Sequence, residues 1–297
     1  MTDFRKLILA ALITLIGAQT AAQTDDAERL KMSALEALIS APPDRALPIV
    51  TKVLAGDSSV ALKERALFVL SQIDLPEART LLIETARSAD ENIRLEAIRM
   101  IGISGEPEAL AELAEIYADG DGDTREAVLQ AYLIADDKNA VYQIAASTED
   151  PGEFEEAVDI LGAMGATEEL RALNNRPGMT EVLIGAYAVA GDTETLAAMA
   201  SDGSDPRRQA QAIRGLAIAG DDDIGDTLIG IYRNTDVPEV REAVLEAFLI
   251  ADEDEAVLEL FRASTDAAEK RELLQRLVIM DSDAVWDLVN STLDNGQ

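Results

Sequence analysis

The chain repeats itself with a period of about 30 residues, and this repeat limits its fold more than any other feature. The twelve residues from Arg125 to Asp136 recur from Arg241 to Asp252 with ten identities, 116 positions apart. Gly or Asp ends each unit, and these anchor residues are separated by 31, 31, 29, 26, 29, 32 and 29 positions. The anchors are Asp74, Gly105, Asp136, Gly165, Gly191, Gly220, Asp252 and Asp281.

Each unit carries the same apolar stripe at fixed distances before its anchor. The positions four, seven and eight residues before every anchor are apolar, and these spacings fall on one face of an α-helix. The residues four before the anchors are Leu70, Ile101, Tyr132, Leu161, Tyr187, Leu216, Phe248 and Leu277. Every unit therefore contributes a helix that buries one face, and Tyr132, Tyr187 and Phe248 are predicted to be core residues rather than cofactor ligands.

A second amphipathic stretch precedes each of these helices, as in Pro76–Ser88, Pro107–Tyr117 and Glu255–Ala263. Turn and N-cap residues separate the two, for example over Asp119–Thr124 and Ser201–Pro206. The sequence contains no alternating apolar and polar runs of the kind that strands show. Each unit is therefore predicted to be a helix, a turn and a helix.

A single helix pair cannot bury its apolar face alone, whereas stacked pairs form a continuous core. We therefore predict an all-α fold: one right-handed α-solenoid of about eight helix-turn-helix repeats over residues 23–297. Residues Asp25–Ser40 and Asp283–Leu293 are predicted to be the capping helices at its two ends. The shortest unit contains Asn174–Gly178, where we expect an irregular stack or a hinge.

The segment Asp236–Arg241, followed by Ala243 and Ala247, resembles the start of the second helix of a HEAT repeat, and Asp90–Arg94 is similar. The short period resembles the HEAT-like repeats of the phycobilisome-lyase type, and the resemblance covers Pro43–Leu293. It implies an α-solenoid that binds proteins as a scaffold or assembly factor.

The resemblance is uneven, because Phe154 and Thr180 stand where two of the repeats should carry Arg.

Two families of enzymes share the repeat. Deoxyhypusine hydroxylases bind iron through His-Glu pairs, and this chain has no His. Phycobilin lyases have the same repeat type, but no motif here specifies tetrapyrrole handling. Neither activity can be assigned to residues of this chain.

The composition removes several classes of chemistry. The chain has no His and no Cys, so the usual zinc, copper, haem and iron–sulfur ligand sets cannot be assembled, nor can a Ser-His-Asp or Cys-His site. With 57 Asp and Glu against 25 Lys and Arg, the net charge is −32, which repels nucleic acid and anionic membranes. That charge also fits a protein from a salty habitat.

Residues Met1–Gln23 have the three parts of a secretory signal peptide. Arg5 and Lys6 form the basic region, Leu7–Ile16 the apolar run, and small residues lead to a predicted cleavage after Ala22. The apolar run is about half the roughly 20 residues that span a bilayer. The segment therefore predicts a periplasmic or secreted protein that is not inserted in a membrane after cleavage.

The loop with Asp119, Asp121 and Asp123 has the spacing of a Ca²⁺ loop, but Thr124 and Gln130 stand where Gly and Glu are required. The favoured interpretation is a solvated turn, and no metal or cofactor is predicted.

A recurring basic column has two interpretations, an anion-binding line or an inter-repeat ladder with nearby carboxylates, of which the ladder is favoured. Its members are Lys63, Arg94, Arg125, Arg241 and Lys270, with the carboxylates Asp90, Asp121 and Asp236. Trp286, the one Trp of the chain, has two interpretations, a packing residue in the closing helix or an exposed anchor, of which the packing residue is favoured.

The residues six positions before the anchors lie just off the apolar stripe and differ from repeat to repeat. In HEAT-like solenoids the second helices line the concave surface, so these varied residues are candidates for a partner site; the alternative is an ordinary solvated face. The column is Phe68, Arg99, Gln130, Asp159, Gly185, Arg214, Glu246 and Gln275, and the predicted partner-binding residues are Arg99, Gln130, Asp159, Arg214 and Glu246.

These features predict an exported, monomeric, non-enzymatic scaffold or regulatory module that binds another protein through its solenoid surface, with no catalytic residues. Two alternatives stay open. One is an accessory lyase-like enzyme that uses carboxylates and Tyr in a pocket with displaced pKa values. The other is a Ca²⁺-dependent surface protein.

Overall fold

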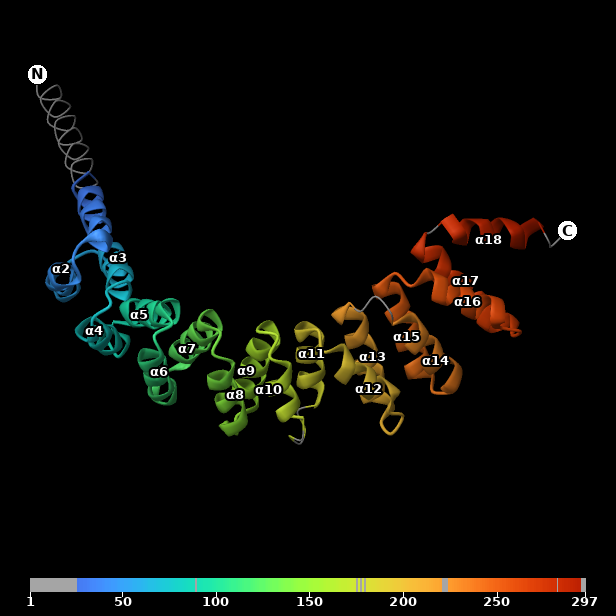
Figure 1. Cartoon of the computed structure of the whole chain (residues 1–297). Coiled ribbons are helices and arrows are strands. Elements are labelled where there is room, and N and C mark those ends of the chain that lie inside the picture. Colours follow the sequence, from blue (N-terminus) through green and yellow to red (C-terminus); the bar gives the residue numbers. More distant parts are fainter. Residues whose placement is uncertain are drawn as a thin grey trace, which may run out of the picture. The chain divides into compact units, whose positions relative to one another are not determined.

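The computed structural model describes residues 26–88, 90–174, 176, 178, 180–220, 224–281 and 283–294 (Figure 1). The predicted signal peptide, residues 1–22, lies outside this part of the chain. The chain divides into two compact units, one ending at Asp137 and the other beginning at Lys138, and each is described by itself. All regular elements of the described residues are helices, so the predicted all-α class is confirmed.

The first unit begins with a helix over residues 26–37 and a short 3₁₀ helix, η1 (Leu38–Ser40), which together match the predicted opening helix. Three helix pairs follow, and the second helices α3, α5 and α7 pack against one another in order. The pairs are α2 (Pro43–Ala55) with α3 (Val60–Ser71), α4 (Pro76–Ala86) with α5 (Glu91–Ser104), and α6 (Pro107–Asp119) with α7 (Gly122–Ala135).

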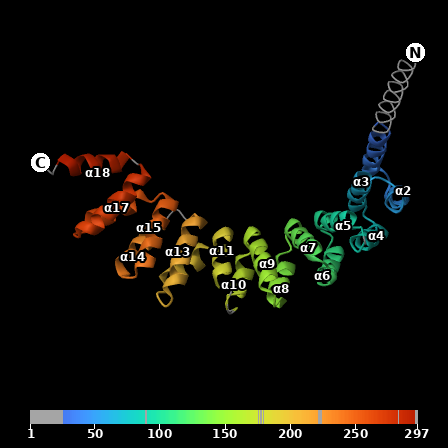
Figure 2. The same ribbon diagram turned by 180° about the vertical axis from the view of Figure 1, so that it is seen from behind.

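The described residues of the second unit form five pairs and the closing helix α18 (Asp283–Asp294), which was predicted. Its second helices α9, α11, α13, α15 and α17 again pack in order along the unit (Figure 2). The pairs are α8 (Lys138–Ser147) with α9 (Pro151–Ala163), α10 (Thr167–Ala172) with α11 (Thr180–Ala190), α12 (Thr193–Ser201) with α13 (Pro206–Ala219), α14 (Gly225–Asn234) with α15 (Pro238–Ala251), and α16 (Asp254–Ala263) with α17 (Ala267–Met280). Each unit is thus built as an α-solenoid of stacked pairs.

The predicted apolar stripe forms the core. Tyr132, Tyr187 and Phe248 are almost fully buried, which confirms that they are core residues. Each tyrosine hydroxyl donates a hydrogen bond to a carbonyl of the preceding first helix, Tyr132 to Leu110 at 3.3 Å and Tyr187 to Leu170 at 3.0 Å. Burial raises the pKa of Tyr187 to about 12. The stripe therefore joins the two helices of a pair by hydrogen bonds as well as by packing.

The anchor residues end the second helices in the left-handed conformation. Gly105, Gly165, Gly191 and Gly220 have φ between 61° and 73°, and Asp136, Asp252 and Asp281 have φ of 55°, 58° and 56°. The first anchor differs, because Asp74 lies three residues beyond the end of α3. Glycine adopts this conformation without steric cost, whereas Asp adopts it against a penalty and places a carboxylate at the negative end of the helix dipole.

Replacing Asp252 by Gly is therefore expected to raise the free energy of unfolding by about 0.5 kcal/mol, because relief of the left-handed penalty and of the dipole repulsion exceeds the added entropy of the unfolded chain. Urea denaturation measures the change. The converse substitution, Gly220→Asp, serves as the matched control and is expected to lower stability. A loss of stability in Asp252→Gly would contradict this account of the anchor.

A polar side chain early in the second helix donates to carbonyls at the end of the first helix, or just beyond it, in several repeats. Arg94 donates to the Ser88 carbonyl at 3.2 Å, Arg125 to the Tyr117 carbonyl at 3.2 Å, and Gln209 to the Ala200 carbonyl at 2.8 Å. These are carbonyls without partners in the helix itself, and a cation beside them also suits the helix dipole. Arg94 and Arg125 of the basic column therefore cap first helices, a role that neither of the two interpretations from the sequence included.

One repeat lacks this residue and receives the cap from further along the chain. Phe154 occupies the position, and the guanidinium of Arg176 lies 4.4 Å from the centre of its ring. Arg176 donates hydrogen bonds to the carbonyls of Ala145 and Thr148 at the end of α8. The shortest repeat, which contains the six-residue helix α10, thus contributes the arginine that its neighbour lacks.

Replacing Arg176 by Met is expected to lower the free energy of unfolding by about 2 kcal/mol, since two charge-assisted hydrogen bonds and a cation–π contact are lost while the stem is kept. Arg207→Met is the control, because Arg207 makes an ion pair with Glu181 but its side chain is 71% exposed, and its loss is expected to cost under about 1 kcal/mol. Chemical denaturation compares the two. Equal costs would contradict the capping role of Arg176.

Candidate functional site

The second helices present one face to solvent, opposite the buried stripe. Residues six and two positions before the anchor share this face, because they are four apart on an α-helix. We call it the outer face. Arg99, Gln130 and Asp159 are exposed on α5, α7 and α9, while Arg214 and Glu246 are partly exposed on α13 and α15. All five predicted partner-binding residues therefore lie on the outer face of their helices.

In the first unit the outer face contains a groove of about 350 Å³ between α5 and α7. Arg99 and Gln130 both line it, and each is held by a carboxylate of its own helix. Arg99 donates to Glu96 at 2.8 and 2.5 Å, and Gln130 donates to Glu126 at 3.0 Å. Further acidic side chains in the lining, such as Asp123, make this groove predominantly acidic.

In the second unit two of the predicted residues bind each other. Arg214 on α13 donates to Glu246 on α15 at 2.6 Å, so this ion pair bridges neighbouring repeats. Asp159 is on α9, and its pKa is raised by partial burial and by the nearby charge of Glu155. The structure thus brings together Arg99 with Gln130 and Arg214 with Glu246, while Asp159 lies on another helix of the second unit.

The outer face also carries aliphatic side chains that the sequence analysis did not single out. Two positions before the anchor, six repeats present an Ile or Val that is 39% to 66% exposed. These residues are Ile103, Ile134, Val189, Ile218, Ile250 and Ile279. The sequence could have identified these residues. Counting from the anchors, which revealed the buried stripe, also places them in one column. Repeated exposure of branched aliphatic side chains is typical of an interaction surface.

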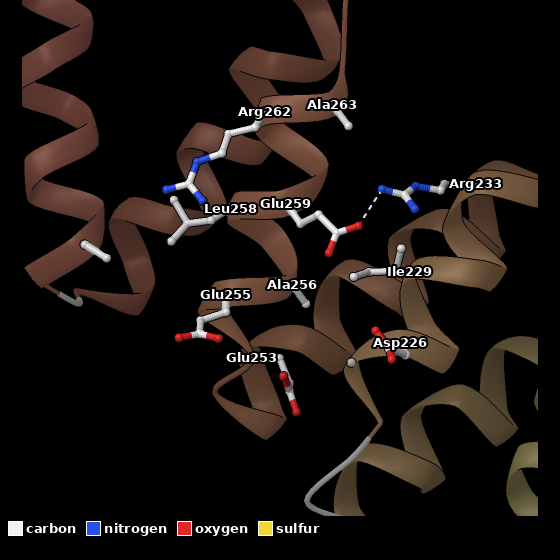
Figure 3. Close-up of a pocket in the computed structure, with 12 residues that line it drawn as sticks. Asp226, Ile229, Arg233, Glu253, Glu255, Ala256, Leu258, Glu259, Arg262 and Ala263 are labelled. Atoms are coloured by element: carbon white, nitrogen blue, oxygen red, sulfur yellow. Dashed lines mark hydrogen bonds and ion pairs between the residues drawn. The ribbon is translucent and has the colours of Figure 1, made fainter.

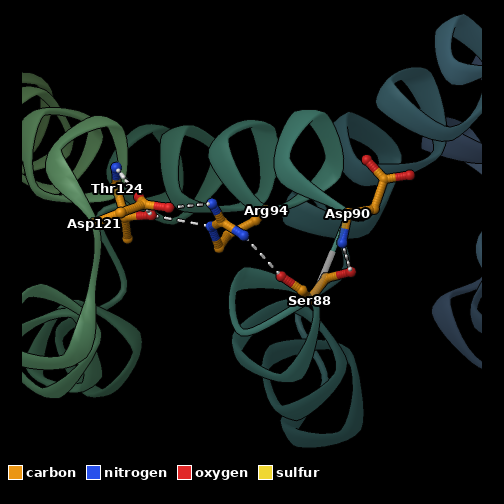
Figure 4. A network of polar contacts seen from close by, with 5 residues as sticks. All are labelled: Ser88, Asp90, Arg94, Asp121 and Thr124. Atoms are coloured by element: carbon orange, nitrogen blue, oxygen red, sulfur yellow. Dashed lines mark hydrogen bonds and ion pairs between the residues drawn. The ribbon is translucent and has the colours of Figure 1, made fainter.

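The acidic loop before α7 has a structural role. Asp121 accepts hydrogen bonds from the backbone N–H and the hydroxyl of Thr124, at 3.0 and 2.5 Å, and so caps α7 (Figure 4). These two bonds hold its pKa below the usual value, and Arg94 of the preceding repeat adds an ion pair at 3.1 Å. The predicted inter-repeat ladder is present here between Arg94 and Asp121, whereas Arg241 pairs with Glu269, at 2.5 Å.

A second hollow lies on the first helices of the second unit, with a volume of about 840 Å³ (Figure 3). Glu259 of α16 pairs with Arg233 of α14 at 2.8 Å across it, and Asp226, Glu253 and Glu255 also line it. Within the described residues, no group of three or more Asp or Glu side chains is arranged to hold a metal ion. The hollow is therefore an acidic surface groove between neighbouring first helices.

Two further features bear on the site. Trp286 is 45% exposed and donates its indole N–H to Asp281 at 2.7 Å, so the prediction of a buried packing residue is wrong. The indole is held at the surface because its polar edge is bonded to the carboxylate that ends α17.

In the part of the chain that the structure covers, none of the helices combines the length and apolar character that a membrane crossing requires.

Comparison with known proteins identifies the repeat. A family model described as HEAT repeats matches residues 47–132, from within α2 to near the end of α7. This part of the chain is similar to HEAT repeats. The predicted resemblance is confirmed for these residues. No curated protein matches the chain.

One solved structure with a similar chain is the complex of CpcE and CpcF of phycocyanin lyase from Nostoc sp. PCC7120. The two chains are 18% identical, with a TM-score of 0.33, and the match covers 78% of this chain and 92% of that one. This finding contradicts our prediction that the chain is not an enzyme, because the matched chain comes from a lyase. That prediction is withdrawn, and the description that stands is a module of HEAT-like repeats.

Proposed function

We propose that this chain is an exported scaffold or assembly module that binds a partner protein through the outer face of its second helices. The observation that supports this most is the contrast between the two sides of these helices. The buried positions are apolar in every repeat, whereas the residues six before the anchors vary in charge, polarity and size from one repeat to the next. Stacked repeats place such varied residues side by side on an extended surface, which suits recognition of a specific partner.

The exposed aliphatic residues of the outer face add to the argument. Full burial of an Ile side chain contributes about 1.5 to 3 kcal/mol, and covering the exposed part of each of these residues contributes a corresponding share of it. Polar and charged side chains stand one helical turn away, as Arg214 does from Ile218. An apolar centre with a charged rim is the usual anatomy of a protein interface.

Export is supported by the sequence of residues 1–22, with its basic, apolar and small-residue regions. The partner is then a protein of the periplasm or the exterior. The charge of −32 favours a partner with a basic surface, because opposite potentials accelerate association.

Affinity capture from periplasmic and secreted fractions tests the proposal, with residues 23–297 as bait. The face variant carries Arg99→Ser, Arg214→Ser and Glu246→Ser, which removes both members of the Arg214–Glu246 pair and, at the exposed Arg99, the partner of Glu96. We expect a protein that the wild type retains and the face variant loses.

A matched control carries the same change of charge on the first helices: Arg233→Ser, Glu259→Ser and Arg262→Ser, which line the hollow of Figure 3. This variant is expected to retain the partner. Loss of the partner by the control alone, or equal capture by the wild type and the face variant, would refute the proposed site. Absence of any captured protein would refute the proposed function.

A further inference from the structure

Four consecutive second helices of the second unit end in an exposed aliphatic residue. We call Val189, Ile218, Ile250 and Ile279, on α11, α13, α15 and α17, the aliphatic row. Their exposed fractions are 66%, 62%, 52% and 66%. Side chains with this much apolar surface in water are ordinary when single, but four at the same position of neighbouring helices form a patch.

The helices keep these residues in register. Arg214 and Glu246, which occupy equivalent positions, meet at 2.6 Å, and Ile218 and Ile250 each follow one helical turn later. Helix α11 also packs against α13, and α15 makes a smaller contact with α17. Packed helices are about 8–10 Å apart, so the row runs across the helices with one apolar side chain at roughly that interval.

Two repeats of the row end in residues that cost stability. Asp252 and Asp281 have φ of 58° and 56°, and each places a carboxylate at the negative end of a helix dipole. Gly191 and Gly220 fill the same position in the other two repeats, so the turn itself does not require Asp. The fold accepts Gly at this position, yet two repeats hold Asp there in a strained conformation. Strain at a residue that the fold does not require is a reason to look for a ligand.

The indole of Trp286 extends the acidic end of the row. Its N–H donates to Asp281 at 2.7 Å, and its side chain remains 45% exposed beside the end of α17. The face of a Trp ring attracts Lys and Arg side chains. Aliphatic, acidic and aromatic groups therefore meet at one end of the second unit.

We propose that the aliphatic row, with Asp252, Asp281 and Trp286, binds an extended, basic and apolar peptide segment of a partner protein. An extended chain advances about 3.1 to 3.4 Å per residue, so every third residue meets the next helix of the row. Apolar residues with this period cover the row. Lys or Arg residues between them lie near the carboxylates, the negative helix ends and the indole. This inference rests on the proposed function and specifies the chemistry of its partner.

The probe is a fluorescein-labelled synthetic peptide of five Leu-Lys-Ser triplets, titrated with the full chain and followed by fluorescence anisotropy. Two control peptides separate the contributions: Leu-Glu-Ser triplets keep the apolar period and reverse the charge, and Ser-Lys-Ser triplets keep the charge and remove the apolar residues. We expect the first peptide to bind at least about tenfold more tightly than either control.

Two variants test the residues. Ile218→Ser, Ile250→Ser and Ile279→Ser together are expected to weaken binding about tenfold or more. Asp252→Gly with Asp281→Gly is expected to weaken binding about fivefold while the melting temperature stays the same or rises, which a loss of fold cannot produce. The control is Ile49→Ser on α2, which is 48% exposed but outside the row and is expected to leave binding unchanged.

Equal binding of the three peptides, or equal binding by the wild type and the triple Ser variant, would overturn the inference. A dimer that the triple Ser variant converts to monomer in sedimentation experiments would also overturn it, because a second copy would then cover the row. If affinity capture retains a partner that the triple Ser variant still binds, the proposed function stands and this inference fails. If no partner is captured, the proposed function fails whatever the peptide shows.

Discussion

Replacing Asp192 by Ala is expected to lower the free energy of unfolding by about 2 kcal/mol, since a buried cap and the partner of an arginine are lost together. Asp192 is 3% exposed and precedes α12, where it accepts the backbone N–H of Thr195 at 3.1 Å. Arg171 of the preceding first helix donates to both of its carboxylate oxygens, at 2.8 and 2.5 Å. The effect is no larger because the side chain of Arg171 is 43% exposed, so water screens the ion pair.

Glu194→Ala is the matched control for this substitution. Glu194 accepts from the same arginine at 2.9 Å, but its side chain is 85% exposed, and its removal is expected to cost under about 0.5 kcal/mol. Urea denaturation of both variants gives the comparison. Similar costs for the two would show that burial of Asp192 is not what stabilises this turn.

The contribution of Asp192 is also expected to depend on pH. Burial raises the pKa of Asp192, but the hydrogen bonds from Arg171 and Thr195 outweigh it and hold the pKa below its ordinary value of 3.8. A carboxylate whose pKa is lowered in the folded state stabilises fully above the unfolded value, and the stabilisation is lost as the pH falls through the folded value. The stability difference between wild type and Asp192→Ala is therefore expected to shrink below pH 3.8. A difference that grows in acid would contradict this assignment.

Replacing Gly102 by Ala is expected to lower the free energy of unfolding by about 2 kcal/mol, because the new methyl group overpacks the contact between α5 and α7. A Cβ atom on Gly102 would lie 2.7 Å from both the Cα and the carbonyl oxygen of Ala131. These are backbone atoms of the next repeat, so the helices must separate to admit it. The loss exceeds the gain in helix propensity, which is at most about 1 kcal/mol.

Two other glycines of second helices give a graded comparison for Gly102. On Gly162 a Cβ atom would lie 3.2 Å from the Cα of Ala186, so Gly162→Ala is expected to change stability much less. On Gly185 nothing lies within 4 Å, and Gly185→Ala is expected to raise stability by about 0.5 to 1 kcal/mol. Thermal and chemical denaturation of the three variants gives the order. A stability of Gly102→Ala equal to that of Gly185→Ala would contradict the close packing of α5 on α7.

Much of the fold was predictable because helix stacking requires the same buried residues in every unit. Counting from the anchors placed Tyr132 and Tyr187 in the core, and their equivalence is visible in the sequence alone. The left-handed conformation of the anchors was not among the predictions, although Gly at four of them favours it. The cap that Arg176 gives to α8 was not predictable, because this arginine lies 28 residues from the Thr148 carbonyl it binds and stands at no repeated position.

The exposure of the five candidate residues was predictable from the sequence, but their pairing was not. Residue type alone does not show that Arg214 and Glu246 bind each other, since the pairing depends on the register between neighbouring helices. The aliphatic residues, such as Ile218 and Ile250, were not singled out because a branched aliphatic residue in a helix is usually part of the core. Only its place opposite the buried stripe distinguishes it.

Site-specific photo-crosslinking in the exporting cell tests most directly whether the outer face of the second helices binds a protein. A photoreactive amino acid is placed at position 99, at position 214 or, on the first-helix side as a control, at position 255, where Glu255 lines the hollow of α16. We expect positions 99 and 214 to give adducts with a partner protein and position 255 to give none. Adducts from position 255 alone, or from none of the three, would contradict the account.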